Sequence, residues 1–278
     1  MAITAAEVNK LRKMTGAGMM DCKKALSETN GDFEAAIDFL RKKGQKVAAK
    51  RADRDATEGV VIAATNSSQD VGTVVYLTCE TDFVAKNSDF IDFAKSISDL
   101  AVSNLPNSKE ELLGLELSGK SLAESLTEQV GKIGEKIEIG AYEKLQSDSV
   151  VAYNHAGFKI GVLVGLNQLA NDSIVAAGKD AAMQVAALNA MAVDKDGVSQ
   201  EIVDRELKIG REQAIAEGKP EQIVDKIAQG KLNKFYKDNT LLNQQFVKDS
   251  SKTVGQYLQT VDGGLTVTSF KRVGLAGK

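Results

Sequence analysis

Residues 59–77 read Gly-Val-Val-Ile-Ala-Ala-Thr-Asn-Ser-Ser-Gln-Asp-Val-Gly-Thr-Val-Val-Tyr-Leu. Two runs of β-branched and small apolar residues flank a polar turn over residues 66–70, a pattern that predicts an antiparallel β-hairpin. A helical pattern follows, in which Phe90, Phe93 and Ile97 share one face. This part of the chain therefore predicts a strand, a turn, a second strand and a helix.

The same order recurs in the second half of the chain. An apolar run over residues 149–153 leads into a polar turn at 154–157, a second run at 160–166 and a helical pattern over 175–185. A last strand, expected over residues 265–270, would complete a sheet near the C-terminus. We interpret the recurrence as an internal duplication, which predicts an α+β fold with a duplicated core and antiparallel sheets.

The first fifty residues predict three short helices, separated by residues 16–18 and by a turn at residues 30–31. The third helix is expected to end at Gly44, since glycine commonly stands just past a helix C-terminus. The basic residues from 42 to 54 would then form a solvated helix or a linker. Three helices in so few residues bury only a small core.

Two methionines begin the second of these helices. Met19 is expected to share an apolar stripe with Cys22 and Leu26, whereas Met20 falls off that stripe. One of the two methionines is therefore expected to be exposed, and an exposed methionine is an adaptable contact for another protein.

Residues 199–235 differ from the rest of the chain because they are charged and helical, with few apolar positions. Glu217-Gly218-Lys219-Pro220 ends one helix and begins the next. Such polar paired helices rarely lie in a core, so we predict an antiparallel hairpin that projects from it.

These patterns divide the 278 residues into four parts. They are a three-helix module with its linker (1–54), a first core half (55–147), a second core half (148–198 with 236–278) and the hairpin inserted in it (199–235).

Composition excludes several functions. The 35 basic and 38 acidic residues give a net charge of −3, which argues against a dedicated nucleic-acid binder. One histidine and two cysteines argue against a zinc site of the usual kind. The N-terminus lacks a signal-peptide pattern, and the apolar run at 160–166 is too short to span a bilayer. We expect a cytoplasmic protein with no membrane segment and no cofactor.

One enzyme motif is present. Residues 114–121 match the G-x-x-x-x-G-K-S pattern of a phosphate-binding loop, which requires a preceding strand and a following helix. The preceding residues predict a helix instead, and Glu116 would repel phosphate. We therefore interpret the match as accidental; the alternative is a nucleotide hydrolase.

Two further positions have more than one interpretation. His155 is the only histidine, and in a predicted turn without a neighbouring nucleophile it is expected to be exposed rather than catalytic, with a partner contact as a third possibility. Phe83 follows Asp82 in a loop after a strand. It either folds back onto the core or stands out as an apolar wedge for a partner, and the pattern does not decide between the two.

Two longer segments carry a family resemblance, and shorter matches to the same family follow in its order over nearly the whole chain. The first long segment is Leu11-Arg12-Lys13-Met14-Thr15-Gly16-Ala17-Gly18-Met19-Met20-Asp21-Cys22-Lys23-Lys24-Ala25-Leu26, the second is Cys79-Glu80-Thr81-Asp82-Phe83-Val84-Ala85, and the shorter ones include Ile133-Gly134-Glu135 and Phe246-Val247-Lys248. In these segments the chain resembles the family of translation elongation factor Ts.

The resemblance implies a ubiquitin-associated-type three-helix module, a two-part core and a protruding coiled-coil hairpin. It also implies a nucleotide exchange factor, not an enzyme, whose partner is elongation factor Tu in its GDP-bound and nucleotide-free states. No direct nucleic-acid binding is expected.

The resemblance further assigns roles to single residues. The loop at Thr81, Asp82, Phe83 and Val84 would disturb the partner's magnesium site, with Ile133 and Gly134 beside it. The other partner-binding positions would be Arg12, Met19, Met20, Lys23, His155 and Val247. Longer relatives carry a helical tail beyond the last strand, and because this chain stops at Lys278 that contact is expected to be absent.

A second alternative is a ubiquitin-associated-type adaptor, in which the first fifty residues would suffice for binding. The hydrolase alternative predicts that the isolated protein binds ATP or GTP.

Overall fold

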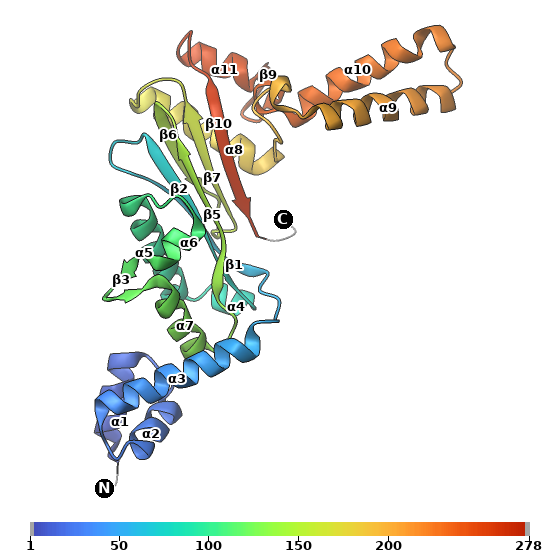
Figure 1. The fold of residues 1–278 in the computed structure, drawn as a ribbon. Helices are drawn as coiled ribbons and strands as arrows, with labels where there is room; N and C mark the ends of the chain where they lie inside the picture. The colour runs from blue at the N-terminus through green and yellow to red at the C-terminus, as the bar shows by residue number, and fades with distance from the viewer. Residues whose placement is uncertain (1–2, 276–278) are drawn as a thin grey trace.

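The computed structural model describes residues 3–275. Two three-stranded antiparallel sheets form the centre of the molecule, three helices stand at one end, and a helical hairpin projects from the other (Figure 1). Helices and antiparallel sheets are thus combined in one chain, which confirms the predicted α+β class.

The first sheet has the order β1-β2-β5. Strands β1 (Glu58–Thr65) and β2 (Val71–Cys79) form the predicted hairpin, with Val61 opposite Tyr76. Strand β5 (Glu138–Gln146) pairs with the other edge of β2 and was not predicted. Because β2 has a strand on each side, and packed layers above and below, every residue along it is buried.

The second sheet has the order β10-β7-β6 and repeats this arrangement. Strands β6 (Ser149–Asn154) and β7 (Ile160–Leu166) form the second predicted hairpin. Strand β10 (Val267–Gly274) pairs with β7; it begins two residues later than expected and extends to Gly274.

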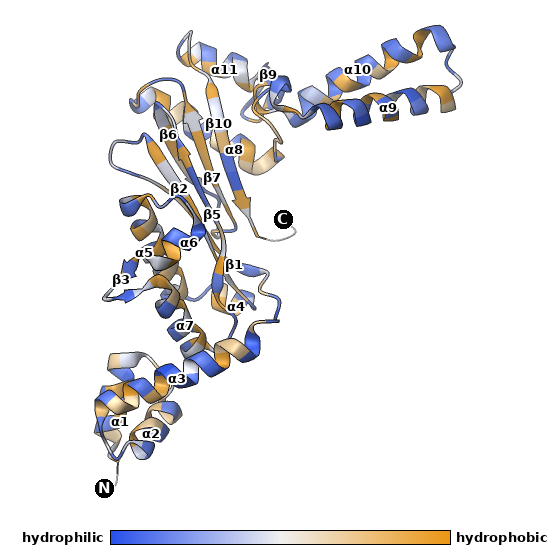
Figure 2. Cartoon of the chain, viewed as in Figure 1, coloured by the Kyte–Doolittle hydropathy of each residue, from blue (hydrophilic) through white to orange (hydrophobic). Residues whose placement is uncertain are grey.

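The sheets pack face to face, and helices cover their outer faces. Alternation along the strands sends every second side chain into the layer between the sheets. Helices α5 (Ser88–Asn104) and α7 (Leu122–Ile133) cover the first sheet; α8 (Asp172–Leu188) and α11 (Val254–Val261) cover the second. The apolar colour of β2 and β7 in Figure 2 marks this core. The residues buried between the sheets are Val61, Ala63, Val74, Tyr76, Leu145, Val150, Leu163, Val273 and Leu275.

The three N-terminal helices are α1 (Ala5–Thr15), α2 (Met19–Glu28) and α3 (Phe33–Arg51). Their small core contains Val8, Leu11, Cys22, Ala25, Leu26 and Ala36. Met19 is 51% exposed, so its predicted place on the buried stripe was wrong. Met20, 74% exposed, is out of the core as predicted.

Helix α3 does not end at Gly44 but continues to Arg51. Gly44 is buried in the crossing of α3 and α7, where a Cβ built on Gly131 would lie 2.7 Å from the Gly44 Cα. Gly44 therefore allows two helices to approach closely and does not cap the end of a helix. The predicted helix-or-linker over residues 42–54 is mainly the continuation of α3.

We expect Gly131→Ala to destabilise the protein by about 1–3 kcal/mol, because the added methyl group overpacks the crossing. Gly230→Ala is the matched control: Gly230 is also inside a helix, but a Cβ there has no atom within 4 Å. That control should stabilise by about 0.5–1 kcal/mol through helix propensity alone. Denaturant unfolding of both variants measures the difference, and equal effects would rule out a tight crossing.

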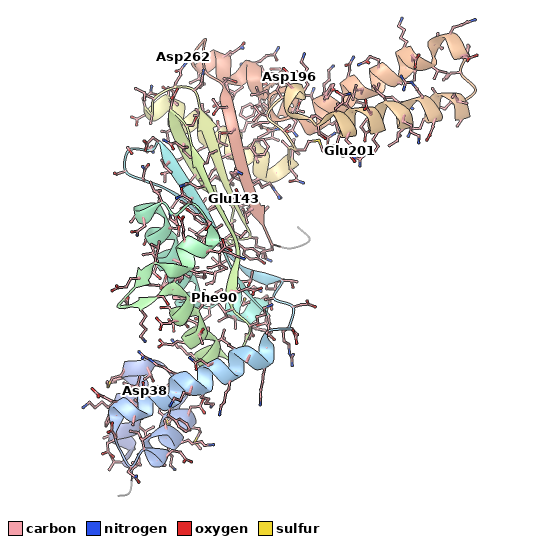
Figure 3. All side chains as sticks on the ribbon, viewed as in Figure 1. Asp38, Phe90, Glu143, Asp196, Glu201 and Asp262 are labelled. Carbon is pink, nitrogen blue, oxygen red and sulfur yellow. The ribbon has the colours of Figure 1, made fainter. Side chains whose placement is uncertain are left out.

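The projecting hairpin consists of α9 (Gln200–Ala216) and α10 (Glu221–Asn239) (Figure 1). Its second helix runs four residues past the expected end at 235. Asp196 and Glu201 lie near its base in Figure 3. The two helices bury Gly210, Ala214, Val224, Ala228 and Leu232 and leave charged side chains outside, which explains the sparse apolar pattern.

The remaining elements are short. They are α4 (Asp82–Ala85), α6 (Lys109–Gly114), β3 (Glu116–Leu117), β4 (Lys120–Ser121), the 3-10 turns Lys195–Gly197 and Leu241–Asn243, β8 (Gln245–Phe246) and β9 (Asp249–Thr253). Among residues 3–275, the helices are all too short or too polar to cross a membrane.

The phosphate-loop pattern at 114–121 folds as the tight β3–β4 hairpin after a helix. Lys120 is the residue that would reach a phosphate. Its Nζ instead donates hydrogen bonds to both carboxylate oxygens of Glu128, at 2.6 and 2.7 Å. Ser121 caps α7. Residues of the pattern therefore cap α7 and pair with it, and the helix that was predicted before the pattern is present.

Candidate functional site

The loop between β2 and α5 exposes an aromatic side chain. Phe83, in the single turn of α4, is 82% exposed, whereas Phe90 at the start of α5 is 2% exposed and lies within the packed layers (Figure 3). Thr81 begins the turn, its hydroxyl accepting from the Val84 amide at 3.4 Å. Phe83 therefore does not fold back onto the core, and the role of the exposed side chain stays a prediction.

A carboxylate from another loop holds the base of this turn. Glu135 Oε2 accepts hydrogen bonds from the amides of Glu80 and Thr81, each at 3.0 Å, and its Oε1 accepts from the Thr81 hydroxyl at 2.7 Å. Glu135 follows Gly134, which ends α7 with φ +83°. The position of this carboxylate is therefore set by the end of a long helix.

Glu80 makes the reciprocal contacts. Its Oε1 accepts from the Lys136 amide at 2.6 Å, and its two oxygens lie 2.8 and 2.9 Å from one guanidinium nitrogen of Arg51, at the end of α3. Burial alone would raise the pKa of Glu80, but the Lys136 amide and the Arg51 guanidinium together lower it below its ordinary value. The carboxylate is thus charged at neutral pH.

Asp82 pairs with Lys86 one turn later, at 2.6 Å. The hydrogen bond and charge of Lys86 lower the pKa of Asp82, and Lys159 adds a smaller effect in the same direction. Both side chains of the pair are partly exposed, so the pair adds little stability by itself.

A groove of about 430 Å³ lies beside Phe83. It separates the three N-terminal helices from α5 and α7, and its walls bring together residues that are far apart in the sequence. Its lining residues include Arg12, Gly16, Gly18, Phe83, Phe90 and Ile133. Four of the predicted site residues, Arg12, Phe83, Val84 and Ile133, therefore line one opening.

Two exposed methionines directly follow a residue of this groove in the sequence. Gly18, which lines it, is the residue directly before α2, and Met19 and Met20 form the first turn of that helix. Lys23, one turn further, is exposed. Arg12 and Phe83, which line the groove, thus give it both a cationic and an apolar side chain.

Two further predicted positions, His155 and Val247, lie on other elements and do not line the groove. His155 is exposed in the turn between β6 and β7, where its Nδ1 lies 3.1 Å from the Tyr153 hydroxyl. Val247, 49% exposed, follows β8, and its amide donates to the buried Gln184 of α8 at 3.0 Å. Within the described residues, His155 and Val247 are thus separate from the predicted positions that line the groove.

Cys79 ends β2 directly below the loop. It is fully buried, its thiol donates to the Thr81 carbonyl at 3.2 Å, and burial, with a smaller contribution from Glu135, raises its pKa to about 12. We expect iodoacetamide at pH 8 to leave Cys79 of the folded protein unmodified and to alkylate it readily in denaturant, because only the thiolate reacts. Peptide mass spectrometry measures this, and rapid labelling of folded protein would show that the loop opens freely.

Comparison with known proteins gives a consistent result. A family model described as "Elongation factor TS" matches residues 80–276. The chain is 56% identical to the elongation factor Ts of Amoebophilus asiaticus over 98% of this chain and 99% of that protein. It is 54% identical to that of Christiangramia forsetii, covering 98% of each chain, and 50% identical to that of Porphyromonas gingivalis, also covering 98% of each.

Proposed function

The chain belongs to the elongation factor Ts family, and we propose that it is a nucleotide exchange factor that binds elongation factor Tu in its GDP-bound form and promotes release of GDP. GTP then binds the empty site for the next round of translation elongation. Family membership supports the exchange role, and the exposed Phe83 beside the groove is the observation that supports the mechanism.

In the proposed mechanism, the loop from Thr81 to Val84 inserts into the nucleotide-binding domain of the partner. Phe83 acts as an apolar wedge, and Asp82 brings a negative charge near the partner's magnesium site. Magnesium neutralises the phosphates of the bound nucleotide, so displacing it weakens nucleotide binding. Ile133 and Gly134 support the loop from the side, and no covalent bond changes in this chain.

The remaining contacts are distributed over the length of the molecule. We propose that residues 1–54 form a ubiquitin-associated-type module that docks through Arg12, Met19, Met20 and Lys23. Residues 55–147 form the first core half, and residues 148–198 with 236–278 form the second, which carries His155 and Val247 to other domains of the partner. Residues 199–235, with the end of α10, form a coiled-coil hairpin.

Linkage gives a direct test of the partner. A protein that weakens nucleotide binding must itself be bound more weakly when nucleotide is present. We expect this chain and elongation factor Tu to co-elute on gel filtration without nucleotide and to separate when GDP and magnesium are added. Co-elution that GDP does not alter would favour a simple adaptor. A separate titration with labelled ATP and GTP tests the hydrolase alternative, and we expect no binding by the isolated chain.

A further inference from the structure

The Phe83 turn is too small to hold its own shape. Helix α4 has four residues, and so short a helix is unstable without outside contacts. With 82% of its side chain exposed, Phe83 contributes little packing of its own. The direction in which Phe83 projects must therefore be set at the base of the loop.

We propose that Glu135 is a positioning residue for exchange, holding the loop so that Phe83 projects, and that Glu80 with Arg51 ties the same loop to α3. Both oxygens of Glu135 are used, by two backbone amides and one hydroxyl. Hydrogen bonds to a charged acceptor are stronger than neutral ones. This inference rests on the proposed function, since exchange is the reaction that Phe83 serves.

The loop that carries Glu80 and the loop that carries Glu135 each accept hydrogen bonds from the other. The Glu80 amide donates to Glu135, while the Glu80 carboxylate accepts from the amide of Lys136, the residue after Glu135. Neither loop can shift without breaking bonds made by the other. Because Gly134 ends α7, the pair of loops is fixed to the covering helix of the first sheet.

Arg51 extends this connection to the N-terminal helices. It contacts both oxygens of Glu80 from the last residue of α3, and α3 crosses α7 closely at Gly44. Helix α3 is also one of the three N-terminal helices, and Arg12 of that group lines the groove. The docking surface and the wedge are therefore parts of one braced unit, joined through a single helix.

The test separates positioning from general stability. Glu135→Gln has nearly the same shape but leaves one oxygen in place of two, so at least one acceptor is lost. We measure release of a fluorescent GDP analogue from elongation factor Tu over a range of concentrations of the full chain. We expect the maximal release rate to fall about tenfold, a usual size for losing a hydrogen bond to a charged group, with the half-saturating concentration changed less than about twofold and the variant folded.

The variant that combines Glu135→Gln with Phe83→Ala gives the decisive measurement. If Glu135 acts through Phe83, Glu135→Gln should add no further loss on a Phe83→Ala background. Glu138→Gln is the matched control: Glu138 is a nearby glutamate whose carboxylate pairs only with Lys136, at 3.3 Å, among the described contacts. Should Glu135→Gln fail to fold, Arg51→Met is tested in its place, with Lys50→Met as its control. We expect the maximal release rate to fall about fivefold for Arg51→Met and to stay unchanged for Lys50→Met.

An equal loss from Glu135→Gln in both backgrounds, or no loss, would overturn the positioning role while leaving the exchange function standing. A wild-type chain that does not accelerate release would overturn both. Faster alkylation of Cys79 in Glu135→Gln than in wild type is the expected structural readout, since the Cys79 thiol donates to the loop carbonyl of Thr81; unchanged protection together with unchanged release contradicts the inference.

Discussion

Phe83→Ala should remove most of the acceleration of GDP release from elongation factor Tu. Aromatic hot-spot residues at interfaces contribute about 2 kcal/mol or more, so the catalytic efficiency of exchange should fall at least about thirtyfold. The side chain is 82% exposed in the free protein, so the free energy of unfolding should change by less than about 0.5 kcal/mol. Release kinetics and denaturant unfolding on the same preparation separate the two quantities.

Leu169→Ala is the control for Phe83→Ala. Leu169 is another apolar side chain on a loop, 78% exposed, and does not line the groove. We expect it to leave release unchanged. If both variants accelerate release as wild type does, the wedge is wrong and the effect on magnesium must come from Asp82 and the N-terminal helices.

Leu163→Ala should have the largest effect on stability. Leu163 is fully buried on β7, in the layer between the two sheets, where Val150 and Val74 also lie. Removing a buried leucine side chain leaves a cavity and costs about 2–5 kcal/mol. At that position the loss weakens the contact between the two sheets, so we expect one cooperative transition shifted to lower denaturant.

Leu169→Ala again serves as the comparison, since it removes the same atoms from an exposed site and should change the free energy of unfolding by less than about 0.5 kcal/mol. A small loss for Leu163→Ala would show that the layer between the sheets is loosely packed. Two separate transitions in the wild type would show that the core halves unfold independently.

The hairpins of both sheets could be predicted because β-branched residues dominate them and polar turns separate their strands. Strand β5 was missed because it mixes Glu138, Glu143 and Lys144 with its apolar residues. It lies at the edge of the sheet, and Glu143, labelled in Figure 3, pairs with Lys271 of β10 at 2.8 Å. An edge strand of this kind has no strong alternating pattern.

Gly44 shows a different limit of prediction from local sequence. Glycine near the end of a helical pattern is a sound signal for termination, but the same residue also permits close helix packing. The residue that decides between these, Gly131, lies 87 positions later (131 − 44). Local sequence carries no information about that distant contact.

The sequence named candidate residues for the site but not the contacts that hold them in place. Arg12, Phe83 and Ile133 were identified from the family resemblance, and the structure places them at one groove. The exposure of Phe83 was undecided, since an aromatic residue in a loop fits both interpretations. The contacts of Glu80 and Glu135 were missed because each carboxylate binds a loop 55 or 56 residues away.

The most direct measurement is the rate of GDP release from purified elongation factor Tu with a substoichiometric amount of this chain. We expect each molecule of the chain to act on many molecules of elongation factor Tu in turn, so that GDP release is accelerated across the whole population. Release at the spontaneous rate, whatever amount of the chain is added, would contradict the exchange function.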